Sequence, residues 1–136
     1  MTEAVVRGAG SPGIRDVDVR VAQPLQAGAG EVLWANALIL GTTENFGYMS
    51  GAMKDFFDRI YYRCLDHTAA LPWSLFIRAG NDGRGARSSI ERIVTGLGWR
   101  QVQEPMIFRG AWNDAWLADC EELGMTMAAG LEAGIF

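Results

Sequence analysis

The chain has 136 residues, which is the size of one domain, and we expect a single domain over residues 1–136. A net charge of −4 and a pI of about 4.9 give no general attraction for nucleic acid or anionic membranes, so neither is expected as a partner. No apolar run approaches the roughly 18–20 residues that span a bilayer, and the first residues are unlike a signal peptide, so we expect a cytoplasmic protein.

The first half of the chain predicts a short helix, a strand, a helical turn and a second strand. Thr2–Ala9 is typical of a helix that ends at glycines. Asp16–Val21 alternates strictly between charged and apolar residues, which predicts a strand with one solvated face. Glu31–Ala35 fits one helical turn. Ala37–Gly41 is a continuous apolar run, which is typical of an interior strand in a parallel sheet.

The middle of the chain predicts a loop, a helix and another strand. Residues 42–48 are polar and aromatic, and we expect a loop there. From Met49 the apolar residues recur at helical spacing, and on another side of this helix Asp55 and Arg59 can pair at i,i+4. Trp73–Ala79 is a second apolar strand.

A second loop and the last two elements follow. Residues 80–85 form a glycine-rich loop, and Ser88 reads as the N-cap of a capping box that starts a helix ending near Gly98. Val102–Phe108 is a strand candidate broken by a proline, and Asn113 or Asp114 caps the last helix. Because strands and helices alternate, the sequence predicts a three-layer α/β fold with a mostly parallel sheet.

Chemistry in such a fold is expected outside the carboxyl ends of the strands, where the two predicted loops lie. Both loops offer what a planar, polar ligand needs: hydroxyls, amides, aromatic rings for stacking and glycines that let the backbone approach. In the first loop these residues are Thr42, Thr43, Asn45, Phe46, Gly47 and Tyr48, and in the second they are the glycines with Asn81 and Asp82. Loops of this composition also serve as plain turns with a helix cap, and the residues alone leave both interpretations open.

Few residues suit other kinds of site. Cys64 and Cys120 are isolated, and we expect two reduced, buried thiols. His67 is the only histidine, so a histidine-based zinc site or a Ser-His-Asp triad would have to run through it. We therefore expect no metal ligands and no catalytic acid or base.

The residues from Gly41 to Arg59 carry a resemblance to a known family. They read GTTENFGYMSGAMKDFFDR, which resembles the signature G-T-P-T-x-F-G-x-M-x-x-x-x-K-x-F-x-D-R of flavodoxin-like NAD(P)H oxidoreductases. This group includes WrbA-type quinone reductases and NADPH-dependent FMN reductases. A second glycine-rich stretch, Ala79–Gly85, stands where the family has its second flavin loop, and the resemblance covers roughly residues 17–108.

The resemblance implies a cofactor, a reaction and a set of binding residues. The cofactor is FMN, NAD(P)H is the co-substrate, and hydride passes through the flavin to a small acceptor such as a quinone or a free flavin. A homo-oligomer is left open as a further partner. The residues implied to line the flavin ring are Thr42, Thr43, Glu44, Asn45, Phe46 and Gly47, and those implied at its polar edge are Gly80, Asn81, Asp82 and Gly83.

One part of the family pattern is missing from this sequence. The family's first strand and its phosphate loop, roughly G-S-x-x-G-x-T, have no counterpart here, and Thr2–Val6 resembles the rest of the helix that follows that loop. In the flavodoxin-like strand order 2-1-3-4-5 the missing strand is the central one. Asp16–Val21 and Ala37–Leu40 would lack their shared neighbour, so we expect the physiological protein to start upstream of Met1.

Other interpretations remain open. A flavodoxin-type electron carrier is the first alternative, although the arginines Arg78, Arg84 and Arg87 near the second loop are unlike the acidic surface such carriers present. These arginines could instead contact a phosphate of NADPH or FMN, or form a solvated rim. A truncated, non-catalytic flavodoxin-like protein is the second alternative.

Overall fold

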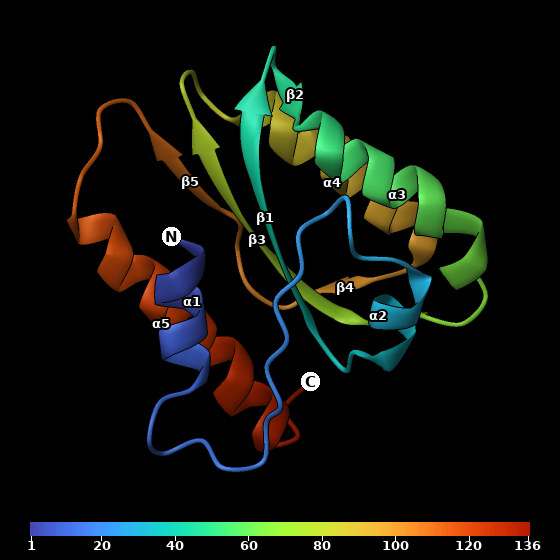
Figure 1. Cartoon of the computed structure of the whole chain (residues 1–136), viewed down its shortest axis with the longest axis vertical. Coiled ribbons are helices and arrows are strands. Elements are labelled where there is room, and N and C mark those ends of the chain that lie inside the picture. Colours follow the sequence, from blue (N-terminus) through green and yellow to red (C-terminus); the bar gives the residue numbers. More distant parts are fainter. The chain divides into compact units, whose positions relative to one another are not determined.

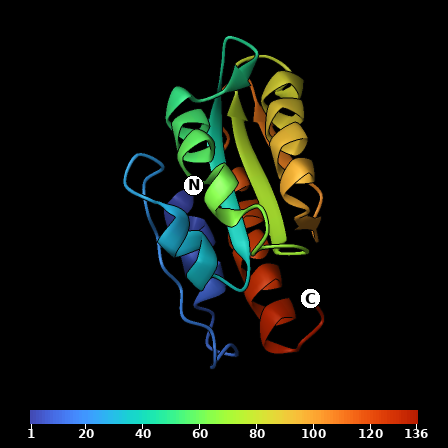
Figure 2. The ribbon, with the colours of Figure 1, turned by 90° about the vertical axis from the view of Figure 1, so that its right-hand side faces the viewer.

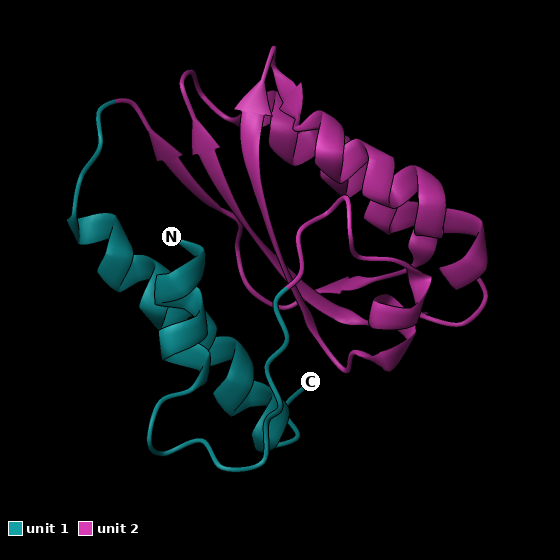
Figure 3. Cartoon of the chain, viewed as in Figure 1, with its two compact units in different colours: residues 1–21, 111–136 teal, residues 22–110 magenta.

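The computed structural model describes all 136 residues and divides them into two compact units (Figure 3). One unit joins residues 1–21 to residues 111–136, and the other comprises residues 22–110.

The first unit is built on two helices in close contact. They are α1, Thr2–Ala9, and α5, Ala115–Glu132, both of which the sequence predicted. A Cβ atom on Gly8 would overlap the carbonyl oxygen of Glu121, and one on Gly124 would overlap that of Val5. Only glycine allows two backbones to approach so closely, so these two positions set the spacing of the helices. Asp114 holds the N-cap position of α5.

The predicted strand Asp16–Val21 is wrong, because the segment has no regular structure and pairs with no strand. Instead the Glu132 carboxylate accepts hydrogen bonds from the backbone N–H groups of Arg15 at 2.6 Å and Asp16 at 2.9 Å. These two bonds favour the charged form and lower the pKa of Glu132. Strict alternation makes a strand only where a neighbouring strand can pair with it, and this segment has none.

The second unit contains one sheet of five strands, shown in Figure 1. The strands are β1 (Leu38–Asn45), β2 (Tyr48–Met49), β3 (Pro72–Ala79), β4 (Arg100–Gln101) and β5 (Met106–Arg109). β3 is central: it pairs in parallel with β1 on one side and with β4 and β5 on the other. On its far side β1 pairs only with the short antiparallel β2. The mostly parallel sheet that the sequence predicted is confirmed.

Two boundaries of the sheet differ from the predictions. The loop expected at residues 42–48 is wrong in its first half, because β1 continues to Asn45 before the chain turns back into β2. Of the strand expected at Val102–Phe108 only residues 106–108 lie in a strand, β5, and the short β4 ends before the predicted range begins. Pro105 lies just before β5, and its missing N–H cannot continue a ladder.

Three helices complete this unit: α2 (Ala29–Trp34), α3 (Gly51–Cys64) and α4 (Arg84–Leu97). α3 and α4 cover the same face of the sheet (Figures 1 and 2), and the core lies between them and the strands. The capping box at Ser88 is wrong, because α4 already begins at Arg84. Gly83 takes the N-cap position there in a left-handed conformation, with φ at 73°. Gly98 ends α4 with φ at 74°, as predicted.

Both cysteines are buried and free, as predicted. Burial raises the pKa of each thiol, so both stay protonated and unreactive near neutral pH. No helix has the length and apolar character needed to cross a membrane. No group of three or more His, Cys, Asp or Glu side chains is placed to hold a metal ion.

Arg59, on α3, binds the irregular segment that precedes α2. Its guanidinium donates to the carbonyl oxygens of Ala27 at 2.7 Å and Pro24 at 2.6 Å, and to the Asp55 carboxylate at 2.7 Å. The ion pair with Asp55 is the one the i,i+4 spacing predicted. One side chain therefore satisfies two backbone acceptors that lie more than thirty residues away in sequence.

Replacing Arg59 with alanine should lower the free energy of unfolding by about 1–2 kcal/mol, because two carbonyl groups lose a charged donor that is itself partly solvated. Urea unfolding followed by circular dichroism measures this. Arg63→Ala, an exposed arginine of the same helix, is the control and should change stability by less than about 0.5 kcal/mol. Equal losses for the two variants would contradict the bridging role of Arg59.

Candidate functional site

The parallel pairing of β1 with β3 brings the two predicted loops to one edge of the sheet. Thr43 lies in register with Arg78, so both strands end at nearly the same level. Beyond that level the Glu44 carboxylate accepts a hydrogen bond of 3.3 Å from the backbone N–H of Asn81. The loops are therefore linked directly, as their placement after neighbouring strands predicted.

The chain turns from β1 into β2 through Phe46 and Gly47, which both have left-handed backbone conformations. Their φ angles are 53° and 69°, as a two-residue hairpin turn of type I′ requires. Gly47 adopts this conformation without strain, but for a phenylalanine it costs about 1 kcal/mol or more. The Phe46 side chain is fully exposed, with a relative accessibility of 108%, so no packing inside the chain offsets this cost.

The hairpin is held against the start of α4. A Cβ atom on Gly85 would overlap the carbonyl oxygen of Gly47, so the two backbones touch where both residues lack side chains. The backbone N–H of Met49 donates to the Ser89 hydroxyl at 3.3 Å. Sequence reasoning missed Gly85 and Ser89 as the support of the hairpin. The only signal was a glycine in the second loop that no turn required.

Thr42 and its neighbours have partners within the first loop. The Thr42 hydroxyl, which is buried, accepts from the N–H of Ser50 at 3.0 Å and donates to the Thr43 carbonyl at 2.9 Å. Ser50 in turn caps α3, because its hydroxyl accepts from the N–H of Met53 at 3.1 Å. The exposed Thr43 hydroxyl donates to the Asn45 side-chain oxygen at 3.1 Å. Thr42 thus shapes the loop from inside, while Thr43 and Asn45 lie at the surface.

The second loop presents mostly backbone. Gly80, Asn81 and Asp82 are exposed, and the Asp82 carboxylate accepts from the N–H of Arg84 at 3.0 Å. Gly83 is buried with a positive φ, and a Cβ atom there would lie 2.5 Å from the Ile107 side chain. Glycine is required at this position for two reasons: the backbone is left-handed there, and a side chain would collide with Ile107. Exposed N–H and carbonyl groups next to a helix N-terminus suit the polar edge of a flat ligand.

All three arginines that the sequence suggested near this edge have partners within the chain, and two of them are held by short contacts. Arg78 donates to the carbonyl oxygens of Ala79 at 2.8 Å and Phe108 at 3.2 Å. Arg87 pairs with Glu91 at 2.6 Å and with a second carboxylate, and the hydrogen bond to Glu91 raises the pKa of Arg87. Arg84 forms a long ion pair of 3.9 Å with the Asp82 carboxylate and keeps 85% of its side chain exposed. Of these three arginines only Arg84 is largely exposed, and Arg109, which lies opposite Ala79 at the end of β5, is a further exposed cation at this edge.

No protein-family model matches the chain, and no curated protein matches its sequence. Several solved structures are similar to it. A flavodoxin from the domain Archaea has a TM-score of 0.76 at 21% identity, over 95% of this chain and 86% of that one. The two-electron reduced flavodoxin of Megasphaera elsdenii has a TM-score of 0.74 at 15% identity, over 94% and 88%. A WrbA-like protein from Agrobacterium tumefaciens has a TM-score of 0.67 at 17% identity, over 93% and 84%.

These similarities confirm the predicted flavodoxin-like α/β fold. At 15–21% identity they establish the fold and leave the activity to be argued from the site itself.

Replacing Gly85 with alanine should destabilise the protein by about 1–3 kcal/mol, because the new methyl group must push the Gly47 carbonyl away. Urea unfolding gives the loss. Gly51→Ala is the matched control: it lies in the first turn of α3 with open space around it, so alanine should be neutral or stabilise by up to about 1 kcal/mol. A Gly85→Ala variant as stable as the wild type would show that the hairpin is not supported by α4.

Proposed function

We propose that the chain binds the isoalloxazine ring of FMN at the edge formed by residues 42–47 and 80–83, and passes hydride from NAD(P)H through FMN to a small acceptor. The observation that carries this proposal is Phe46, a fully exposed aromatic ring in a strained backbone conformation. Strain that nothing inside the chain compensates is typical of functional positions. An exposed ring beside exposed backbone donors is a suitable surface for a flat, polar heterocycle.

The residues at this edge fit such a ring in two respects. Phe46 would stack on or beside its face, and the Asn81 N–H would donate to a ring carbonyl once Glu44 releases it. That hydrogen bond is long, at 3.3 Å, which makes it easy to exchange for a ligand atom. Gly80 has no side chain, and open space surrounds its Cβ position, so a ligand could approach the backbone there.

The chemistry would come from the bound flavin, which accepts a hydride from a nicotinamide and releases electrons to an acceptor. The protein's part would be to hold, orient and shield the ring, and none of its own side chains needs to act as acid or base. Arg84, the exposed cation beside the second loop, would attract the phosphates of NAD(P)H. The support of the hairpin by Gly85 and Ser89 would keep Phe46 in place.

A flavodoxin-type electron carrier is the second candidate, and one observation favours it. The sequence argued against a carrier because three arginines lie near the second loop. Arg78 and Arg87 bind groups of the chain itself and Arg84 is paired with Asp82, so these three arginines weigh less against a carrier than the sequence suggested. The similar structures named flavodoxins point in the same direction. A non-catalytic flavodoxin-like protein is the remaining candidate.

Mixing the purified chain with FMN and NADPH separates these candidates. Under the proposal, the protein binds added FMN and becomes yellow, and the fluorescence of the FMN is quenched. NADPH is then consumed when menadione, a small quinone, is added. Bound flavin without NADPH consumption would favour the carrier. If the chain neither binds FMN nor consumes NADPH, the proposal is overturned in favour of the non-catalytic alternative.

Phe46→Asn should separate stability from binding. Asparagine tolerates the left-handed conformation, so the free protein should be unchanged or more stable by up to about 1 kcal/mol. Loss of the ring should raise the FMN dissociation constant about three- to tenfold. Fluorescence titration and urea unfolding supply the two readouts. Phe46→Tyr, which keeps both the ring and the strain, should bind like the wild type. Unchanged FMN affinity in Phe46→Asn would exclude stacking on this residue.

Riboflavin and FMN should bind with affinities within about threefold of each other, because the proposed contacts are to the ring and the exposed Arg84 is already paired with Asp82. Isothermal titration calorimetry of the two ligands measures the ratio. A preference for FMN of about thirtyfold or more would mean that a phosphate-binding group outside the proposed residues contributes.

A further inference from the structure

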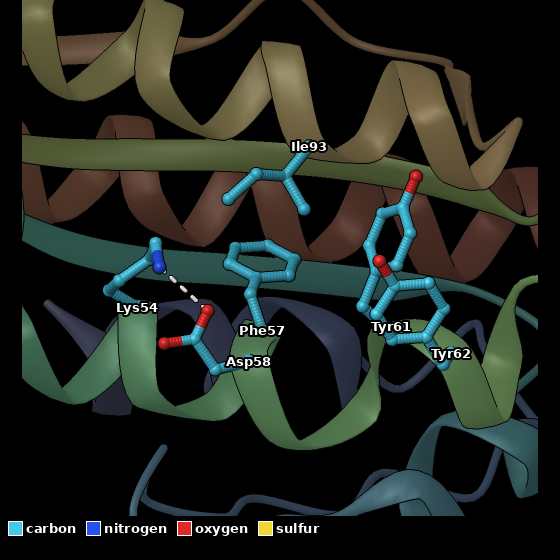
Figure 4. Close-up of a pocket in the computed structure, with 6 residues that line it drawn as sticks. All are labelled: Lys54, Phe57, Asp58, Tyr61, Tyr62 and Ile93. Atoms are coloured by element: carbon cyan, nitrogen blue, oxygen red, sulfur yellow. Dashed lines mark hydrogen bonds and ion pairs between the residues drawn. The ribbon is translucent and has the colours of Figure 1, made fainter.

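The outward sides of α3 and α4 enclose a surface hollow of about 230 Å³ that the proposed flavin site does not use. Figure 4 shows the six residues that line it: Lys54, Phe57, Asp58, Tyr61, Tyr62 and Ile93. Five of them belong to α3 at positions i, i+3, i+4, i+7 and i+8, so they form one stripe along the helix. With a rise of about 1.5 Å per residue the stripe is about 12 Å long.

This stripe is unusually aromatic for a helix face in contact with water. Tyr62 is 83% exposed and makes an edge-to-face contact with Tyr61, with ring centroids 5.2 Å apart. On α4, a Cβ atom at Gly96 would overlap the Tyr61 hydroxyl, so the missing side chain makes room for that ring. An exposed tyrosine next to a half-buried one, around an apolar floor, is typical of protein–protein contacts, where tyrosine is enriched.

The charges on the stripe indicate which kind of surface could bind to it. Lys54 and Asp58 form a 2.6 Å ion pair at the rim of the hollow, and the hydrogen bond to Asp58 raises the pKa of Lys54. Along α3 a positive charge, on Lys54, is therefore followed by a negative charge, on Asp58. A copy of α3 related by a two-fold axis runs in the opposite direction, so in it the negative charge comes before the positive one. The face is thus complementary to itself, which is the condition for a symmetric dimer.

We propose that a second copy of this chain docks on the outward face of α3 and α4 about a two-fold axis, with Lys54 of each copy opposite Asp58 of the other. The axis then crosses α3 at the level of residue 56. Tyr62, six residues beyond that level, lies opposite Ser50, six residues before it. Next to Ser50 is Gly51, which has open space above its Cβ position and leaves room for the ring. The dimer buries the tyrosines and covers the hollow, and it does not depend on flavin.

The test is the mass of the protein in solution without FMN, measured by sedimentation velocity over a concentration range of about 1–200 µM. Twice the chain mass of 14.8 kDa, or 29.6 kDa, is expected as the concentration rises. Tyr62→Ser should weaken association about tenfold or more. Its side chain is largely exposed, so the variant should fold like the wild type, which circular dichroism checks. A wild type of 14.8 kDa at every concentration would overturn the proposal.

Charge reversal tests the arrangement itself. Lys54→Asp alone makes both facing positions acidic and Asp58→Lys alone makes both basic, so each variant should associate about tenfold more weakly than the wild type. An equal mixture of the two should regain dimers, because acidic faces then meet basic ones. Arg63→Asp, on another side of α3, should associate like the wild type. Failure of the mixture to regain dimers would overturn the proposed pairing, since damage within each chain cannot be repaired by mixing.

Discussion

Six residues of β1 pair in parallel with six residues of β3, from Leu38 opposite Trp73 to Thr43 opposite Arg78. This register determines where the rest of the second unit lies. Parallel strands deliver both of their following loops to the same edge, and α3 and α4 return over one face of the sheet to make this possible. Shifting the pairing by one residue would turn the apolar side chains of β1 away from the core. The contact between Glu44 and Asn81 and the contact between Gly47 and Gly85 both depend on this register.

The hairpin of this site is well supported by hydrogen bonds and close contacts, but the backbone conformation of its turn costs free energy. Ser50 and Thr42 fix the base of the hairpin, and on α4 Ser89 binds its second strand while Gly85 contacts its turn. Within the site, only Phe46 has a backbone conformation that its own side chain disfavours, and its ring is fully exposed. A protein selected only for stability would have asparagine or glycine there. We regard the excess free energy at this residue as the main physical sign that the edge binds something flat.

The sequence was a good guide wherever one physical signal acted alone. The apolar run of β3 and the helical spacing of α3 needed no partner to be recognised, and both elements are where they were predicted. The left-handed Gly98 was likewise readable, because glycine after a periodic apolar pattern is a common helix end.

The failures involve residues whose role is decided by their neighbours in the folded chain. Asp16–Val21 has the pattern of a strand but no strand beside it, so its alternation has no consequence. Ser88 suited a capping box, yet Gly83 and Asp82 start the same helix earlier. Arg78 resembled a phosphate ligand and instead binds carbonyl groups of its own sheet. Gly85 gave no sign of its role, because contact between two glycines distant in sequence is a property of the folded chain.

The central claim is that a flavin ring binds where Phe46 and the second loop meet. Two-dimensional ¹⁵N NMR of the labelled chain, with riboflavin added stepwise, tests it most directly, because each backbone N–H reports on its own surroundings. We expect the largest shifts at Phe46, Gly47 and Asn81, with little change at Tyr62. Absence of shifts at these three amides, or shifts confined to another face, would contradict it.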